Sequence, residues 1–250
     1  MRILLTNDDG IHAPGLALLE SIARTLSDDV WVCAPAEEQS GAGHALTLHM
    51  PVRLREHGER RYSVTGTPTD SVNLALRKLF ADKMPDLVIS GINSGENLAD
   101  DVTYSGTVSA AMEAALAGIP AIALSQAFRG TGPGFAIAEA WGAKVIKPLM
   151  ATPMAKRTLI NVNFPACAPD AVRGIRVVRQ GFHDYARGSL VEGTDPRGRS
   201  YYWFGLEEME HTLDHGTDLE AVSENYVAVT PLQLDLTDHA AIGRLAEQFG

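Results

Sequence analysis

Residues 1–16 read "MRILLTNDDGIHAPGL", and the change of character within this stretch decides the fold that we predict. The apolar run Ile3–Leu5 has the composition of a buried strand, and it passes at once into Asp8, Asp9 and a glycine. Apolar residues then recur at helical spacing, with Pro14 near the expected helix start. The stretch therefore predicts a strand, an acidic turn and a helix. The two adjacent carboxylates repel each other, so the turn requires a compensating positive charge.

The same alternation continues outward along the chain. We predict strands at residues 2–7, 30–36, 85–93, 119–126, 158–165 and 225–238, and helices at 14–28, 67–80, 105–118, 135–150 and 240–249. Residues 46–66 predict an extended hairpin that turns near Gly58. Uninterrupted Val/Ile/Leu strands that alternate with helices are typical of a mostly parallel sheet covered on both faces. The sequence thus predicts an α/β fold.

Length and composition limit the remaining possibilities. The chain has 250 residues, 45% of them hydrophobic, which suits one large domain (1–250) or a domain with an appendage. The formal net charge of −10 argues against binding to a nucleic acid polymer, because such proteins carry a basic face. Two distant cysteines form neither a disulfide framework nor a zinc cluster. We found no signal peptide and no membrane span, and we expect a cytoplasmic protein.

The last third of the chain differs from the rest. Residues 174–205 contain short strand patterns around a glycine-rich polar loop, and they include the aromatic run Tyr201–Phe204. Residues 182–224 are the candidate for a hairpin-rich arm. One interpretation is an arm used in oligomerisation, since such apolar residues are hard to bury within one chain. The other interpretation is a long surface loop, and the sequence does not decide between them.

Four polar segments fall at predicted strand ends or helix starts, where the ligands of parallel α/β sheets bind. These segments are Asp8–Asp9; residues 37–47, with Ser40 and His44; residues 90–97, with Asn93 and Asn97; and the helix start Ser105, Gly106 and Thr107. Each segment alone is more typical of an ordinary turn or helix cap. Their coincidence at one predicted edge of the sheet indicates a site, in which His44 is a candidate substrate contact.

Carboxylate, hydroxyl and amide oxygens are hard donors that suit Mg²⁺, Mn²⁺ or Ca²⁺. A cation there would also relieve the repulsion between Asp8 and Asp9. The helix start at Ser105–Thr107 offers backbone N–H groups to an anion, and Gly106 allows a close approach to the backbone. A divalent ion beside an anion site is suited to hydrolysis of a phosphate ester. Asn97 is a further candidate phosphate contact.

The stretches "ILLTNDDGIHAPGL", "SGAGHALTL", "GTPTDSVNLAL", "SGINSGENLADDVTYSGTVSAAMEAALAGIPAIALS" and "YVAVTPLQLDLTD" together resemble the SurE (survival protein E) family of 5'-nucleotidases. The resemblance runs in order from residue 3 to residue 238, and its first and fourth stretches are the most specific.

This resemblance implies a Rossmann-like α/β core and a metal-dependent hydrolysis of nucleoside 5'-monophosphates, with broader phosphatase or exopolyphosphatase activity in some members. It implies metal ligands at Asp8, Asp9, Ser40 and Asn93. It also implies one divalent ion per subunit, for which Mg²⁺ and Mn²⁺ are the first candidates and Ca²⁺ a further one. It also implies a C-terminal arm that forms homodimers or homotetramers. Asp8 and Asp9 are the candidate catalytic residues, and the sequence does not choose which of them acts on the water.

Three other classes fit the sequence less well. A phosphoacceptor receiver domain needs an Asp at the end of a middle strand, where this chain has Asn93. A haloacid-dehalogenase-type phosphatase needs an Asp-x-Asp arrangement after its first strand, and "NDDG" has a different spacing. A dinucleotide-binding enzyme carries G-x-G-x-x-G after that strand, and this chain does not.

Overall fold

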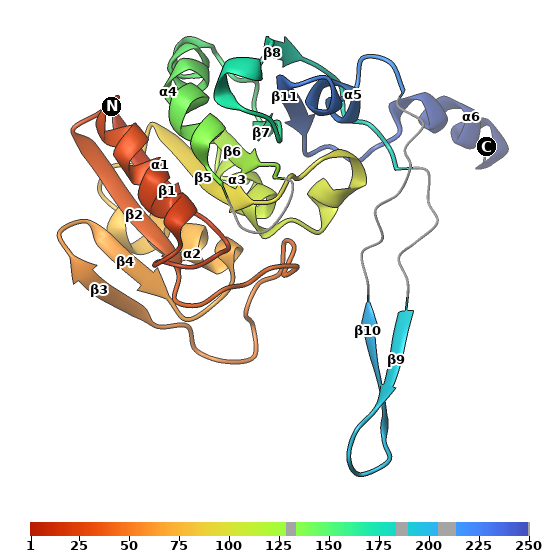
Figure 1. Ribbon diagram of the computed structural model, residues 1–250, viewed down its shortest axis with the longest axis horizontal. Coiled ribbons are helices and arrows are strands. Elements are labelled where there is room, and N and C mark those ends of the chain that lie inside the picture. Colours follow the sequence, from red (N-terminus) through yellow and green to blue (C-terminus); the bar gives the residue numbers. More distant parts are fainter. Residues whose placement is uncertain (129–133, 184–189, 205–213, 250) are drawn as a thin grey trace.

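The computed structural model of the protein describes residues 1–128, 134–183, 190–204 and 214–249. One large sheet forms the body, and a two-stranded hairpin stands apart from it (Figure 1). The strands are β1 (Arg2–Thr6), β2 (Asp29–Pro35), β3 (Leu54–Gly58), β4 (Arg61–Val64), β5 (Leu87–Ser94), β6 (Ala121–Gln126), β7 (Thr158–Phe164), β8 (Gly174–Val177), β9 (Leu190–Thr194), β10 (Ser200–Phe204) and β11 (Tyr226–Gln233). The α-helices are α1 (Pro14–Arg24), α2 (Pro68–Leu74), α3 (Gly106–Leu116), α4 (Ala136–Ala151), α5 (Asp218–Ser223) and α6 (His239–Phe249). Shorter helical turns are η1 (Ala75–Leu79), η2 (Ala99–Thr103) and η3 (Pro169–Ala171).

The large sheet has the strand order β3-β4-β2-β1-β5-β6-β7-β11-β8. Strand β1 pairs in parallel with β2 on one side and with β5 on the other. The chain therefore leaves β1 in one direction and returns on its other side, so the strand order reverses at β1. In open parallel sheets such a reversal opens a crevice beyond the carboxyl ends of the strands. The predicted α/β fold with a mostly parallel sheet is confirmed. The exceptions lie towards the two edges, where β3 runs antiparallel to β4 and β11 runs antiparallel to β7.

The pleat of β1 divides the core into two layers. Ile3 and Leu5 point to the layer that contains α1 and α4, whereas Leu4 points to the layer that contains α2 and α3. All three side chains have no exposed surface. This burial on both faces explains why the strand is an unbroken apolar run instead of an alternating one.

The observed elements differ from the predicted ones mainly at their ends. The helix predicted at 67–80 is α2 followed by the wider turn η1, and it begins with a capping box between Thr67 and Asp70. In the hairpin predicted at 46–66, only β3 and β4 are strands, and they turn at Gly58 as predicted. The first helix ends at Arg24, four residues before the predicted end, and the backbone N–H of the capping residue Thr25 donates to the carbonyl oxygen of Ile22 at 3.0 Å.

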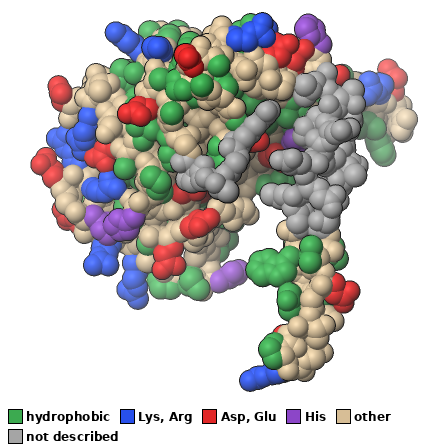
Figure 2. All heavy atoms as spheres, viewed as in Figure 1, with side chains coloured by type: hydrophobic (Ala, Val, Ile, Leu, Met, Phe, Trp, Pro, Cys, Tyr) green, Lys and Arg blue, Asp and Glu red, His purple; other side chains and the backbone are tan. Residues whose placement is uncertain are grey.

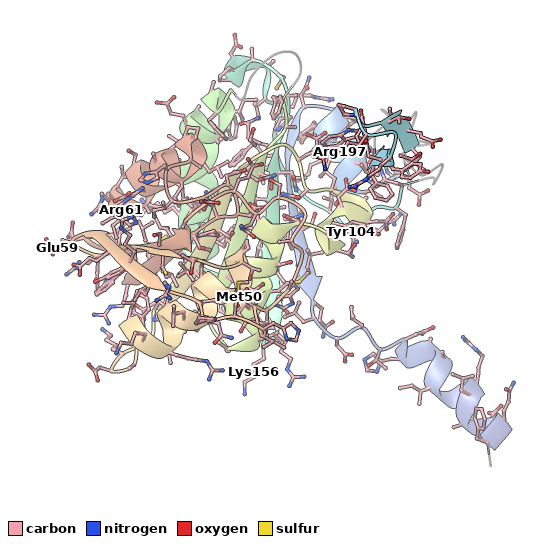
Figure 3. All side chains as sticks on the ribbon, turned by 90° about the horizontal axis from the view of Figure 1, so that it is seen from below. Met50, Glu59, Arg61, Tyr104, Lys156 and Arg197 are labelled. Atoms are coloured by element: carbon pink, nitrogen blue, oxygen red, sulfur yellow. The ribbon has the colours of Figure 1, made fainter. Side chains whose placement is uncertain are left out.

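The C-terminal third contains the two parts that extend from the body. Strands β9 and β10 form an antiparallel hairpin that projects away from the sheet, and α6 projects separately (Figures 1 and 3). Of the arm predicted at 182–224, residues 184–189 and 205–213 lie outside the described residues. The division into one domain with an arm stays a prediction. In the described part of the chain, none of the helices combines the length and apolar character needed to span a membrane.

Helix α1 packs so closely on β5 that Gly15 has no room for a side chain. A Cβ at Gly15 would lie 2.0 Å from the carbonyl oxygen of Ile92, which is backbone and cannot rotate away. We therefore expect Gly15→Ala to lower the free energy of unfolding by about 2–4 kcal/mol, measured by urea denaturation. Gly243→Ala in the exposed helix α6 is the control, because nothing lies within 4 Å of its Cβ position, and it should be neutral or slightly stabilising. Equal stability of Gly15→Ala and the parent would contradict this close packing.

Candidate functional site

Asp8 and Asp9 lie directly beyond the carboxyl end of β1, in the crevice where the strand order reverses. Asn7 shapes the turn by donating a hydrogen bond from its side-chain amide to the carbonyl oxygen of Gly10, at 3.0 Å. Asp8 is 4% exposed and Asp9 is half-buried. The two predicted acids are thus at the predicted edge of the sheet, where Asp8 is shielded from solvent and Asp9 is partly shielded.

The carboxylate of Asp8 packs against the first turn of α3. It accepts a hydrogen bond from the hydroxyl of Thr107. A Cβ at Gly106 would lie 2.7 Å from the Cβ of Asp8, so the helix can approach this closely only because residue 106 is glycine. The helix start, which we predicted as a phosphate site, is therefore already in contact with one of the predicted metal ligands.

Burial raises the pKa values of both acids, and the charge of Asp8 also raises the pKa of Asp9. The pKa of Asp8 lies above its usual range, chiefly because the group is buried, although the hydrogen bond from Thr107 lowers it in part. The pKa of Asp9 is raised to about 6 by burial and then by the charge of Asp8. None of the ion pairs found among the described residues involves either acid. Among the described residues, no cationic side chain therefore compensates the charge of Asp8 and Asp9.

The loop after β2 approaches the acids from the other side. The backbone N–H of Gln39 donates to the carbonyl oxygen of Asp8 at 2.8 Å, which places Ser40 next to the acidic turn. The hydroxyl of Ser40 is exposed and donates to the Glu38 carboxylate at 2.9 Å. The charge of Glu38 also raises the pKa values of Asp8 and Asp9. Glu38 is the site residue that our sequence analysis missed, and its position two residues before Ser40 was the available signal.

The end of β5 provides the third side of the site. The backbone of Ser94 faces the Asp9 carboxylate and lowers its pKa, so the neighbouring Asn93 lies beside the acids. Asn93 donates from its amide nitrogen to the carbonyl oxygen of Gly95 at 2.9 Å, which leaves its side-chain oxygen as an acceptor. Asn97 is 7% exposed, and its amide nitrogen donates to the Ser125 hydroxyl at 2.7 Å. Asn97 is therefore held as part of the loop, and its contact with phosphate stays a prediction.

Two predicted substrate contacts have other partners in the structure. The side chain of Ser105 caps α3 by accepting the N–H of Val108 at 3.1 Å. The ring of His44 lies 3.2 Å from the carboxylate of Glu113 in the middle of α3, and Glu113 also accepts a hydrogen bond from Asn73 of α2. These contacts fix the helix start and the loop, and the substrate roles of both residues stay predictions.

The donor set around the acidic turn fits a hard divalent cation. Within the described residues, no group of three or more His, Cys, Asp or Glu side chains is arranged to hold a metal ion. A cation bound by Asp8 and Asp9 would therefore be completed by neutral oxygens, and the Ser40 hydroxyl and the Asn93 amide oxygen are the adjacent ones. Oxygen donors of this mixture are those that Mg²⁺ and Mn²⁺ prefer.

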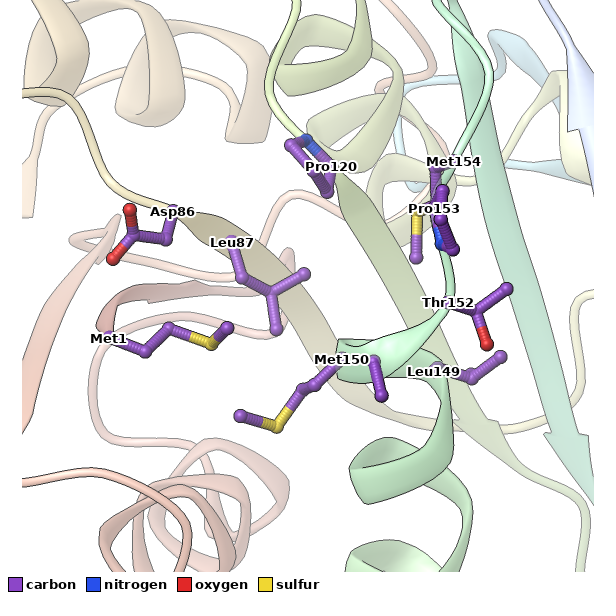
Figure 4. A pocket seen from close by; sticks show the side chains of 10 residues that line it. Met1, Asp86, Leu87, Pro120, Leu149, Met150, Thr152, Pro153 and Met154 are labelled. Atoms are coloured by element: carbon purple, nitrogen blue, oxygen red, sulfur yellow. The ribbon is translucent and has the colours of Figure 1, made fainter.

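A separate cavity of about 310 Å³ lies at the opposite edge of the sheet. Its lining includes the starts of β1 and β5 and the segment after α4, with Met1, Asp86, Met150 and Met154 among the side chains (Figure 4). It contains none of the predicted site residues. Because ligands of such sheets bind at the carboxyl ends of the strands, this cavity is not the candidate site.

A doubly wound sheet with an oxygen-rich acidic site beside a helix start defines a Rossmann-like α/β protein with candidate positions for a cation and an anion. The chain belongs to the SurE family, described as survival protein SurE, which matches residues 3–187. The resemblance seen in the sequence is thereby confirmed.

Relatives match the chain over nearly its whole length. The "5'-nucleotidase SurE" of Erythrobacter litoralis is 67% identical and covers 100% of both chains. The protein of the same name from Rhizorhabdus wittichii is 59% identical and covers 97% of each. The crystal structure of the SurE protein from Aquifex aeolicus superposes with a TM-score of 0.87 at 39% identity, with 100% of both chains covered. The fold is therefore that of a solved SurE protein.

The raised pKa of Asp9 predicts a stability effect in protein treated with a chelator. With a folded-state pKa of about 6 and an ordinary value of 3.8, the ionised side chain destabilises the fold. This penalty is absent below about pH 3.8, grows as the pH rises towards 6, and is complete above it. We expect Asp9→Asn to raise Tm by several degrees at pH 7.5 and to have a smaller effect at pH 5. Asp82→Asn, at an exposed position far from the site, is the control and should change Tm equally little at both pH values.

Proposed function

We propose that the chain is a 5'-nucleotidase that hydrolyses nucleoside 5'-monophosphates to nucleoside and phosphate with the help of a divalent cation. The observation that carries this proposal is the buried, repelling pair Asp8–Asp9, packed against the start of α3 at the carboxyl edge of the sheet. The full-length relatives that bear the name 5'-nucleotidase support it. We also propose that the protein acts in the cytoplasm.

Asp8, Asp9, Ser40 and Asn93 would hold the cation. Its chemistry there would be to polarise a phosphoryl oxygen and to lower the pKa of a bound water. The two carboxylates supply the negative charge that retains it, and burial strengthens this attraction because the local dielectric is low.

Asp8 and Asp9 have different surroundings, which suggests different roles. The hydroxyl of Thr107 already donates to the buried Asp8 carboxylate, so the main task of Asp8 is to keep the start of α3 in position beside the cation. The backbone of Ser94 lowers the pKa of Asp9, and Asp9 is half-buried. Asp9 therefore has lone pairs free to orient the attacking water and to accept its proton, and we assign it that role.

The start of α3 supplies the anion side of the site. Its first-turn N–H groups and the helix dipole favour negative charge, which stabilises a phosphate and the charge that develops on it during hydrolysis. We propose that Gly106 and Thr107 contact the phosphate there, that Ser105 keeps the first turn in place as its cap, and that Asn97 and His44 bound the substrate pocket.

The proposal is tested by measuring phosphate release from nucleoside 5'- and 3'-monophosphates and from polyphosphate, with Mg²⁺, Mn²⁺, Ca²⁺ or Zn²⁺ added after chelation. We expect release from the 5'-monophosphates, loss of activity on chelation, and recovery with Mn²⁺ or Mg²⁺. Full activity in thoroughly chelated protein would refute the metal requirement, and release only from 3'-monophosphates or polyphosphate would refute the substrate assignment.

The same assay ranks the proposed ligands when metal concentration is varied. Asp8→Asn and Asp9→Asn should each lower kcat/KM by more than about 100-fold even at millimolar metal, because residues that merely orient metal ligands are already worth about 10- to 100-fold. Ser40→Ala should recover in part as metal is raised, since water can replace a neutral donor. Asn93→Ala should fall between them. Circular dichroism should confirm that the variants fold. If folded Asp8→Asn and Asp9→Asn release phosphate as fast as the parent, these two residues are not metal ligands.

We further propose that the chain forms a homodimer or homotetramer through the β9–β10 hairpin. The aromatic side chains of β10 are exposed, Trp203 to 68% and Phe204 to 92%, and Figure 2 shows apolar side chains along the projecting hairpin. Such a surface favours association. Light scattering across micromolar concentrations should give at least twice the chain mass, and replacing Trp203 and Phe204 by Ser should shift the mass towards the monomer. A monomeric parent would refute this proposal.

A further inference from the structure

The buried carboxylate of Asp218, which lies outside the proposed site, connects the base of the arm to the loop of residues 97–105, which leads to the start of α3. We define the arm root as residues 179–183 and 214–218, which precede and follow the part of the chain that contains β9 and β10. Its two halves are joined by backbone hydrogen bonds, from Arg179 to Gly216 at 3.2 Å and from Asp218 to Arg179 at 3.0 Å. Asp218 lies at the end of this root and begins α5.

The side chain of Asp218 has no exposed surface. One carboxylate oxygen accepts the backbone N–H groups of Gly181, at 2.8 Å, and of Leu219, at 2.9 Å. The other oxygen accepts the N–H of Ala99 at 3.0 Å. Ala99 is 119 residues away in the sequence and lies in the loop between β5 and α3, so this carboxylate joins the arm root to that loop.

The arm root holds Ala99 by both of its backbone groups. Besides the N–H bound by Asp218, the carbonyl oxygen of Ala99 accepts a hydrogen bond from the side chain of Gln180 at 2.9 Å. Ala99 has φ = +49°, a left-handed conformation that is unfavourable for a residue with a Cβ. The next residue is held too, because the backbone N–H of His183 donates to the Asp100 carboxylate at 3.1 Å. These contacts maintain a backbone conformation that the loop would not favour by itself.

The loop transmits this constraint to the proposed site over a short distance. The carbonyl oxygen of Asp101 accepts the backbone N–H of Ser105, at 3.1 Å, and Ser105 is the cap of α3. On its other side the loop continues to Asn97, whose backbone carbonyl oxygen accepts the side-chain amides of Asn161 and Asn163. The segment fixed by Asp218 therefore lies between Asn97 and the helix start that contacts Asp8.

We infer that Asp218 is a positioning residue: it fixes the loop of residues 97–105, and through that loop the start of α3, relative to Asp8 and Asp9. This inference rests on the proposed nucleotidase function for its kinetic consequence, but not for its structural one. The arm root thereby becomes part of the support of the site, so that a change in the arm alters the reaction without any arm residue touching the substrate.

The test compares Asp218→Asn with the parent by hydrogen–deuterium exchange and by steady-state kinetics. Asparagine keeps the shape, but its amide group would face one of the N–H donors that now bind a carboxylate oxygen. We expect faster exchange in peptides that cover residues 97–107 and unchanged exchange in α1. We also expect kcat to fall by about 10- to 100-fold, with KM changed by less than about threefold, because small misplacements of reacting groups reduce turnover strongly.

Two further variants separate positioning from a general loss of structure. Asp238→Asn is the matched control, because its carboxylate also accepts backbone N–H groups, those of Ala240 and Ala241, but its described contacts lie at the start of α6 and not in the arm root. It should leave both exchange and kcat unchanged. Gln180→Leu removes the bond to the Ala99 carbonyl oxygen and should repeat the exchange effect at residues 97–107, and it serves if Asp218→Asn does not fold.

Unchanged exchange at residues 97–107 in folded Asp218→Asn and in Gln180→Leu would overturn the inference, as would a change in KM alone. If the parent has no activity on any nucleotide, the proposed function fails, whereas the exchange measurement still decides whether Asp218 holds the loop.

Discussion

The close approach of Asp8 to the first turn of α3 is the contact on which the site depends. Thr107 donates to the Asp8 carboxylate, and Gly106 leaves the space that Asp8 fills. This contact joins the end of the first strand to a helix about a hundred residues later. The position of the helix start, and with it any anion held there, is thus set by one of the acids. A larger side chain at residue 106 would separate the two halves of the site.

The acidic turn also imposes an energetic constraint. Two neighbouring carboxylates are partly removed from water, a third charge at Glu38 stands near them, and their pKa values rise in consequence. Such an arrangement destabilises the fold unless a cation or a proton neutralises it. The apolar core on both faces of the sheet provides the stability that tolerates this cost, as is common at functional sites.

The arm root holds a second part of the structure, the loop between β5 and α3, in a conformation that this loop would not favour by itself. A nine-stranded sheet fixes β1 and β5 firmly, but the loop between β5 and α3 leaves the sheet and includes a left-handed alanine. Its conformation is held from outside, by Asp218 and Gln180. The hairpin has exposed aromatic side chains, and the proposed contact with a second copy would therefore lie on the same arm as the residues that hold the loop.

The sequence by itself determined the order of strands and helices along the chain and the mostly parallel sheet, because the spacing of apolar residues differs between buried strands and helices. It also placed the acids, the amides and the glycine-containing start of a helix at one edge of the sheet, because each of these segments lies at the end of a predicted strand or the start of a predicted helix. The sequence also determined the family, through stretches such as "TNDDG" that resemble those of SurE proteins and occur in the same order along the chain. Only the tertiary structure decided the ends of the helices and strands and the contacts between distant residues. These contacts are those of Thr107 with Asp8, of Glu38 with the acids, of His44 with Glu113 and of Asp218 with Ala99. Each of these contacts joins residues whose distance in space depends on packing between elements, and no local pattern in the chain specifies that distance.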